Sequence, residues 1–274
     1  MLLHITALSK DFKEGGTRIF LLEYAYQCLV GYNTKTVTKA GYQEMVGASF
    51  NSVGAEALDI QDITLVGDNA NGTAWIKWWD PASKTYSDRA VYVDTLCDPS
   101  DPTGDTDLDY GGWGDNDWFP VVKTFAPGEG FWFSPAKNGV GITTAGSVEK
   151  SANQYIGRTV DVAGRQIMVI NAFPTTLDIQ SIVLENDNAN GTAWIKWWDS
   201  AAKTYSDRAV YVDTLCDPSD PTGDTDLDYG GWGDNDWFPV DKEFAVGDGF
   251  WFSPAKNNVT ICFPNPFYVA PVAP

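Results

Sequence analysis

Aspartate is concentrated in one stretch, GDTDLDYGGWGDNDWFP, which occupies residues 104–120 and returns unchanged at 223–239. Its first three aspartates stand at alternate positions, a DxDxD spacing that lets carboxylates converge where the chain curls, and paired glycines follow. Ca²⁺ takes hard oxygen ligands from carboxylates, main-chain carbonyls and water. The stretch therefore predicts a calcium site in each copy, with the ligands Asp105, Asp107, Asp109, Asp115 and Asp117, and Asp224, Asp226, Asp228, Asp234 and Asp236.

The spacing resembles calcium loops of the DxDxD type but departs from the EF-hand pattern. Tyr110 stands where that motif needs glycine, and no glutamate closes the loop. The resemblance therefore implies ligands and not a conformational switch. Asp115 and Asp117 either complete one shell or form a second site with Asp98 and Asp101. A solvated acidic loop without an ion is the alternative, and magnesium is disfavoured because it keeps most of its waters.

The tryptophans of the same loops suggest a second function, carbohydrate binding, because exposed aromatic faces stack on sugar rings. Trp75, Trp78, Trp79 and Trp132 fall on expected strands, where burial in a core is the commoner fate. The loop tryptophans are the candidates for calcium-dependent carbohydrate binding: Trp113, Trp118, Trp232 and Trp237.

Enzyme chemistry is disfavoured. A glycosidase needs two carboxyl groups in unlike environments, whereas these candidates are all aspartates that cluster in one loop and occur twice. The chain's one histidine, His4, precedes both copies of the loop, so a triad of the usual kind is absent. We expect no catalytic residues and no enzymatic activity.

Charge restricts the class of partner. The 274-residue chain carries a formal net charge of −19, and sixteen of these charges lie in two stretches, Asp80–Asp117 and Asp199–Asp236, each with ten aspartates, one lysine and one arginine. Nucleic acids and anionic membrane surfaces are disfavoured, because both need clustered lysine and arginine. No apolar run approaches the length that spans a bilayer. Cations are the natural partner class.

The four cysteines allow several disulfide pairings. Cys97 and Cys216 are equivalent repeat positions, whereas Cys28 and Cys262 lie near opposite chain ends. One pairing is Cys28–Cys97 with Cys216–Cys262, another joins Cys28 of one chain to Cys262 of the next, and a third possibility is four buried thiols. With no CxxC pair, a zinc site is improbable.

An internal repeat organises the chain. Residues 69–138 align without a gap to 188–257 and differ at six of seventy positions, and the flanks align more loosely. Two explanations compete for this identity: a recent duplication, or the same functional requirement acting on the acidic segment of both copies. We expect an N-terminal extension over 1–30, repeat domains over 31–146 and 154–263, a linker over 147–153 and a proline-rich tail over 264–274.

Each repeat reads as all-β. TAWIKWWD alternates Trp75, Lys77 and Trp79 on one face with Ile76 and Trp78 on the other. Frequent turn signals separate about seven or eight short strands in each repeat. The sequence therefore predicts two tandem homologous β-sandwich or small-barrel domains with long acidic calcium-binding loops.

The chain ends suggest assembly. Residues 17–30, TRIFLLEYAYQCLV, are apolar and have no counterpart before the second repeat, so they are a candidate donor strand for a neighbouring subunit. Head-to-tail contacts that do not close give filaments. Both tails folding back on their own domains is the alternative.

Three short motifs carry a family resemblance: VGYNTKTVTKAGYQEMVGASF, LDIQDI and GEGFWFSP. They resemble uncharacterised secreted β-domain proteins of Planctomycetes–Verrucomicrobia-type bacteria, which implies export but no catalytic residues. The first residues lack a signal-peptide pattern, so either the chain is intracellular or the precursor starts elsewhere. Asn71, Asn190 and Asn258 are glycosylation candidates for an exported glycoprotein.

These observations favour an extracellular or cell-surface structural protein. We expect a calcium-stabilised subunit that self-assembles head-to-tail through its terminal segments into a filament, fibre or surface layer. A secreted calcium-dependent carbohydrate-binding protein is the alternative.

Overall fold

The protein is all-β. The computed structural model describes residues 30–101, 103, 106–148, 153–220, 222 and 225–268. Strands make up 46% of the structure and helical residues 3%, so the predicted all-β class is confirmed. The expected N-terminal extension, apart from Val30, lies outside the described residues.

The first repeat forms three antiparallel sheets. A three-stranded sheet has the order β1-β11-β4, a six-stranded sheet has the order β2-β10-β5-β7-β8 with β6 paired to β5, and β3 pairs with β9. The described strands are more numerous than expected. They are β1 (Val30–Val37), β2 (Glu44–Gly47), β3 (Leu58–Asp59), β4 (Thr64–Val66), β5 (Asn71–Asp80), β6 (Thr85–Tyr86), β7 (Ala90–Val93), β8 (Gly112–Gly114), β9 (Thr124–Phe125), β10 (Gly130–Ser134) and β11 (Val140–Ser147), with the 3-10 helix η1 (Ile60–Asp62) after β3.

The second repeat has the same topology. Its sheets have the orders β12-β22-β15, β13-β21-β16-β18-β19 with β17 paired to β16, and β14-β20. The strands are β12 (Tyr155–Val160), β13 (Ile167–Ile170), β14 (Leu177–Asp178), β15 (Val183–Glu185), β16 (Asn190–Asp199), β17 (Thr204–Tyr205), β18 (Ala209–Val212), β19 (Gly231–Gly233), β20 (Glu243–Phe244), β21 (Gly249–Ser253) and β22 (Val259–Pro264), with η2 (Ile179–Ser181) after β14.

Strand β5 shows how sequence periodicity builds the core. Ala74 and Ile76 are buried inside the first repeat, and Trp78 packs against the same cluster. The predicted alternation is confirmed, because Trp75 and Trp79 point to the opposite face. That face is covered as well, so β5 is apolar on both sides, as expected of a strand with two buried faces.

Each repeat has its own hydrophobic core, but the boundary is not clean. Phe50 of the first repeat and Val148 of the expected linker belong to the core of the second repeat. The start of the C-terminal tail also packs there, because the Phe267 and Phe173 rings lie 6.0 Å apart. The backbone N–H of Asn265 donates to the Gln154 carbonyl at 2.8 Å. This part of the tail therefore folds back on its own repeat.

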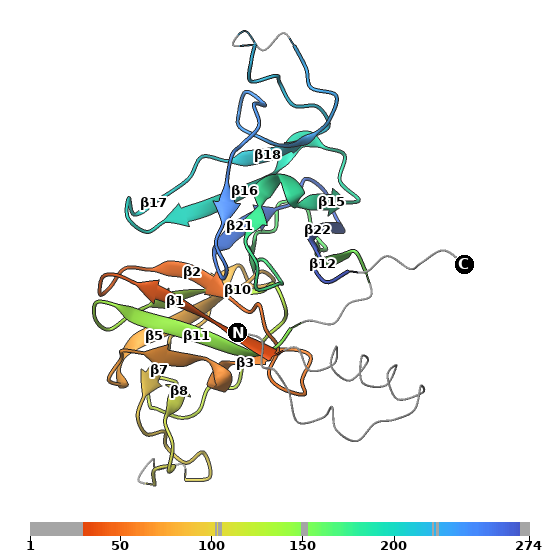
Figure 1. Cartoon of the computed structure of the whole chain (residues 1–274). Coiled ribbons are helices and arrows are strands. Elements are labelled where there is room, and N and C mark those ends of the chain that lie inside the picture. The colour runs from red at the N-terminus through yellow and green to blue at the C-terminus, as the bar shows by residue number, and fades with distance from the viewer. Residues whose placement is uncertain are drawn as a thin grey trace, which may run out of the picture.

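The two repeats contact each other through their six-stranded sheets. Figure 1 shows β2 and β10 of the first repeat facing β21 of the second. The two acidic loops lie at opposite ends of the molecule, the first in yellow at the bottom and the second in blue at the top. The described parts of both loops lie away from the contact between the repeats.

Candidate functional site

The root of the acidic loop is held by burial. Leu96 and Trp113 are fully buried, and Leu108 packs on the cluster that contains Leu96. Three main-chain hydrogen bonds close this root: the N–H of Leu96 donates to the Tyr110 carbonyl at 3.1 Å, that of Leu108 to Leu96 at 2.7 Å, and that of Cys97 to Trp118 at 2.9 Å. The second loop makes the same bonds. Apolar anchors therefore fix a segment that has little regular strand.

A glutamine side chain acts as a strand partner for the loop. Gln61 donates from Nε2 to the carbonyls of Trp113 at 2.8 Å and Val121 at 3.0 Å, and its Oε1 accepts from the Trp113 N–H at 2.9 Å. A Cβ at Gly112 would lie 2.4 Å from this Oε1, so a larger residue there would displace the Gln61 side chain. Gln180 makes the same contacts in the second repeat. The motif LDIQ thus positions the acidic loop.

Several loop carboxylates cap turns. Asp115 accepts from the N–H groups of Asp117 at 2.9 Å and Phe119 at 3.0 Å. Asp101 accepts from the hydroxyls of Thr103 at 2.7 Å and Thr106 at 2.8 Å. The Thr103 hydroxyl and N–H, with Thr106, lower the pKa of Asp101 to about 2. Hydrogen bonding that favours the charged form explains the direction. These carboxylates stabilise the loop's own folds.

Three of the predicted calcium ligands, Asp107, Asp115 and Asp117, act on the thiol of Cys97. Asp107 forms a β-bridge with Cys97, and burial followed by the charges of Asp107, Asp115 and Asp117 raises the pKa of the Cys97 thiol. Within the described ranges, no group of three or more Asp, Glu, His or Cys side chains is placed to hold a metal ion. Asp105 and Asp224 lie outside those ranges. Calcium binding by the loop stays a prediction.

Burial divides the loop tryptophans into two kinds. The interpretation of Trp113 and Trp232 as sugar platforms is wrong, because both rings are fully buried and Trp113 Nε1 donates to the Ile63 carbonyl at 2.7 Å. Trp118 and Trp237 are 44% and 43% exposed. Both have φ of +65°, which is uncommon for a bulky side chain. One exposed tryptophan per repeat therefore remains available for a ligand.

The described cysteines are free thiols. Cys97, Cys216 and Cys262 are buried free thiols, so the alternative in which Cys216 pairs with Cys262 is wrong. The Cys97 and Cys216 Sγ atoms each contact a main-chain carbonyl at 3.4 Å, those of Asp117 and Asp236. Burial, with the charge of Glu185, raises the pKa of Cys262 to about 11. Cys28 lies outside the described residues, so its pairing between chains stays a prediction.

Sequence reasoning missed the aromatic junction between the repeats. The junction consists of the residues that the two six-stranded sheets bury against each other. All of its members except Tyr205 occur as equivalent pairs, which gives the contact an approximate two-fold symmetry. They are Met45, Trp75, Trp79, Trp132, Met168, Trp194, Trp198, Tyr205 and Trp251.

Ring contacts in the junction are reciprocal. Trp79 of the first repeat lies edge-to-face on Trp251 of the second, with centroids 5.5 Å apart. Trp132 lies in the same way on Trp198 at 5.6 Å. Such pairs stabilise by about 0.5–1.5 kcal/mol beyond their area burial. A surface in which each residue meets the equivalent of its own partner is self-complementary.

Ion pairs and hydrogen bonds flank the aromatic junction. Lys35 pairs with Asp248, and at the equivalent place Arg158 NH1 lies 4.0 Å from Glu129 Oε2. Burial lowers the pKa of Arg158, and Glu129 opposes that shift. The Ile170 N–H donates to the Gly128 carbonyl at 3.0 Å, and this main-chain bond crosses between the repeats.

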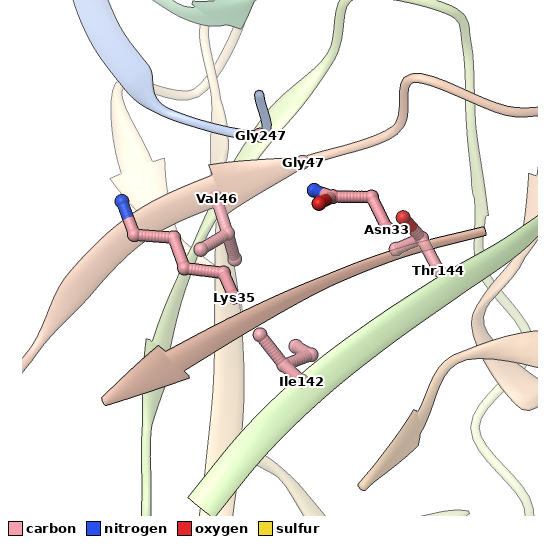
Figure 2. A pocket seen from close by; sticks show the side chains of 7 residues that line it. All are labelled: Asn33, Lys35, Val46, Gly47, Ile142, Thr144 and Gly247. Atoms are coloured by element: carbon pink, nitrogen blue, oxygen red, sulfur yellow. The ribbon is translucent and has the colours of Figure 1, made fainter. Parts of the chain in front are cut away.

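A small pocket opens beside one of these ion pairs. Figure 2 shows Asn33 and Lys35 from β1 reaching toward Gly247 of the second repeat, over Ile142. Its volume is about 10 Å³, close to the least that holds one water molecule. This pocket is a packing defect of the junction and not a ligand site.

A larger groove of about 450 Å³ lies over β12, β15 and β22. In the first repeat, the hydroxyls of Thr34 and Thr143 meet at 2.7 Å across the equivalent strands. Gly157 and Cys262 stand at this place in the second repeat, and their smaller side chains leave the groove open. Glu185 is the charged side chain among the residues that line it.

The glycosylation candidates are exposed. Asn71, Asn190 and Asn258 are accessible, and Asn71 Oδ1 accepts from the Thr73 hydroxyl. Modification of these residues stays a prediction. Among the described residues, no helix has the length and apolar character needed to cross a membrane.

Comparisons with protein families, with curated proteins and with solved structures find no match to this chain. The assignment of function therefore depends on the acidic loops, the junction and the chain ends.

Proposed function

We propose that the protein is an extracellular or cell-surface structural protein, a calcium-stabilised subunit that assembles head-to-tail into a filament, fibre or surface layer. In this proposal the two repeats are tandem domains of sandwich or small-barrel type. The terminal segments join successive subunits, and calcium neutralises the acidic loops.

The observation that carries the proposal is the placement of the two loops. They lie at opposite ends of one block whose halves are fastened by the junction (Figure 1). Asp80–Asp117 and Asp199–Asp236 concentrate most of the chain's net charge of −19 in and beside these loops. Ends of equal sign repel in water, so close packing of subunits needs a cation between them.

Open sheet edges give a donor strand a place to add. Among the described strands, β1 pairs with β11 alone and β12 pairs with β22 alone. Strand addition to such an edge supplies main-chain hydrogen bonds. The C-terminal segment through Tyr268 packs on its own repeat, so residues 1–29 are the candidate donor.

Two measurements test the proposal. Negative-stain images of the full chain with calcium should show filaments or sheets, and deletion of residues 1–29 should give non-polymerising protein that stays folded. Chelation should lower the melting temperature, and Asp107→Ala with Asp226→Ala should reduce that sensitivity. A full chain that stays monomeric at high concentration, with its N-terminal segment protected from protease, would show that the assembly proposal is wrong.

Exposure of Trp118 and Trp237 favours carbohydrate binding as the second candidate function. Each ring is half exposed beside a loop rich in aspartate, so it can stack on a sugar while a cation binds the hydroxyls. Glycan-array binding that needs calcium and is lost in Trp118→Ala with Trp237→Ala would support it. Equal binding by that variant would contradict it.

A further inference from the structure

A second pair of aspartates, outside the acidic loops, lacks partners. Asp68 lies in the turn between β4 and β5, and Asp187 lies at the equivalent place between β15 and β16. Both carboxylate oxygens of Asp68, and Oδ1 of Asp187, are shielded from solvent and have no hydrogen-bond partner among the described residues. Oδ2 of Asp187 accepts from the Ala189 N–H at 2.9 Å. A shielded carboxylate loses its hydration, and here the protein replaces little of it.

No basic side chain neutralises these carboxylates. The five ion pairs of the described residues involve other acids, namely Glu44, Asp248, Glu129 and Asp161. An unpaired charge in a shielded place is costly in either repeat. Its occurrence at both equivalent positions points to a partner that is not a side chain.

The turn around each aspartate has one backbone shape. Gly67 and Ala70 have φ of +82° and +50°, and Asn186 and Ala189 have φ of +61° and +47°. The shape is kept although Gly67 is replaced by Asn186. A left-handed alanine is strained. Each turn is fastened to the next strand, because the Ala70 carbonyl accepts from Asp94 N–H at 2.9 Å, as does that of Ala189 from Asp213. The aspartate is therefore held in place before any ligand arrives.

The carboxylate of Asp187 lies near an aromatic pair. Burial raises the pKa of the Tyr211 phenol, and the negative charge of Asp187 adds to that rise. The Tyr211 ring lies 5.1 Å from Trp232, and Tyr92 and Trp113 have the same separation in the first repeat. A luminescent lanthanide bound at Asp187 would have an aromatic donor close by in Tyr211, and Tyr92 is the equivalent residue of the first repeat.

We propose that Asp68 and Asp187 each bind a calcium ion, whose remaining ligands are main-chain carbonyl oxygens of the same turn and water. Calcium accepts this mixture of one carboxylate and neutral oxygens in an irregular shell. Magnesium demands near-octahedral geometry, so a strained turn suits it less. These sites are separate from the loop ligands, and they do not depend on the proposed function.

The experiment uses the full chain and removes the loop ligands first. The background variant is Asp107→Asn with Asp226→Asn, and the test variant adds Asp68→Asn and Asp187→Asn. Melting temperature is measured in chelator and in calcium chloride at constant ionic strength. We expect a calcium-dependent rise of about 2–4 °C to survive in the background and to vanish in the test variant.

Behaviour in chelator gives a second readout. Asparagine keeps the shape of aspartate but removes the unpaired charge, so the test variant should melt higher than its background in chelator and lower in calcium. Terbium luminescence excited through tyrosine and tryptophan should fall by about half in each single variant, Asp68→Asn or Asp187→Asn, if the two sites are equal.

Two outcomes would overturn the proposal. One is a calcium-dependent rise that persists in the test variant. The other is a melting temperature and a terbium signal that stay the same when Asp68 and Asp187 are replaced in the background variant. Water would then be the partner of both carboxylates. Loss of loop-dependent calcium sensitivity alone would bear on the proposed function and not on these sites.

Discussion

The acidic loops and the aromatic junction lie in the same near-identical segment of the repeat, yet they keep their sequences for different physical reasons. Junction residues such as Trp132 and Trp198 contact each other across the repeats, so a change in one copy disturbs the other. Loop residues such as Asp101 and Thr106 contact only their own copy. Contacts between the repeats therefore constrain the junction residues of both copies, whereas the contacts within one loop place no constraint on the other loop.

The contrast also explains how a self-repelling loop stays folded. Apolar anchors and main-chain bonds fix its root, and Gln61 in η1 holds the loop by its bond to Trp113 in β8. Charge is then tolerated at the surface, where water screens it. The junction is stabilised differently. Its aromatic rings exclude water, and its charged side chains lie at the edge.

The largest expected effect comes from removing a junction ring. Trp251→Ala should lower the free energy of unfolding by about 3 kcal/mol, because the side chain is almost fully buried against Trp79. Trp132→Ala should cost about the same, since its contacts are equivalent. The half-exposed loop residue is the control, and Trp118→Ala should cost less than about 1 kcal/mol in urea unfolding followed by fluorescence. If Trp118→Ala lowered the free energy of unfolding as much as Trp251→Ala, the contrast between loop and junction would be wrong.

A smaller effect should reveal where the two-fold symmetry fails. Trp79 Nε1 donates to the Gln166 carbonyl at 2.9 Å, whereas Trp198 Nε1 is buried without a partner among the described residues. Trp79→Phe loses that bond, but Trp198→Phe removes an unsatisfied donor. Trp79→Phe should therefore be less stable than Trp198→Phe by about 1 kcal/mol in chemical denaturation. Equal losses would mean that both indoles find a partner in solution.

The smallest effect concerns the loops alone. The folded-state pKa of Asp101 and Asp220 is about 2, below the ordinary value of 3.8. Ionised Asp101 thus favours the folded state above pH 3.8, and this contribution disappears as the pH falls through about 2. Thr103→Val should raise the pKa of Asp101 toward its ordinary value, measured by NMR titration of the side-chain carboxyl carbon. Asp220 in the same molecule is the control, and an equal rise there would contradict a local cause.

Periodicity in the sequence was enough to predict the strands but not their partners. Alternation in β5 correctly separates Ile76 from Trp75 and Trp79, because a pleated strand sends successive side chains to opposite faces. It does not say what covers the second face. Aromatic residues on both faces were a usable signal, since a strand of that kind is buried on both sides.

Residues within the loop were harder to place. Trp113 and Trp118 are five positions apart in a segment without strand pattern, and one is fully buried while the other is half exposed. The difference depends on Gln61, which is far away in sequence and holds Trp113 at the edge of β7. Cysteine pairing was also beyond the sequence, because spacing alone does not determine which sulfur atoms meet.

The junction has a consequence for how the protein responds to dilution and to mutation. A self-complementary contact between separate subunits weakens as protein concentration falls, but one within a single chain does not. The same covalent link frees each half to change alone, since a substitution need not appear on both sides of the contact. Lys35 with Asp248 on one side, and Arg158 with Glu129 on the other, are two solutions to the same pairing that a true two-fold dimer could not hold together.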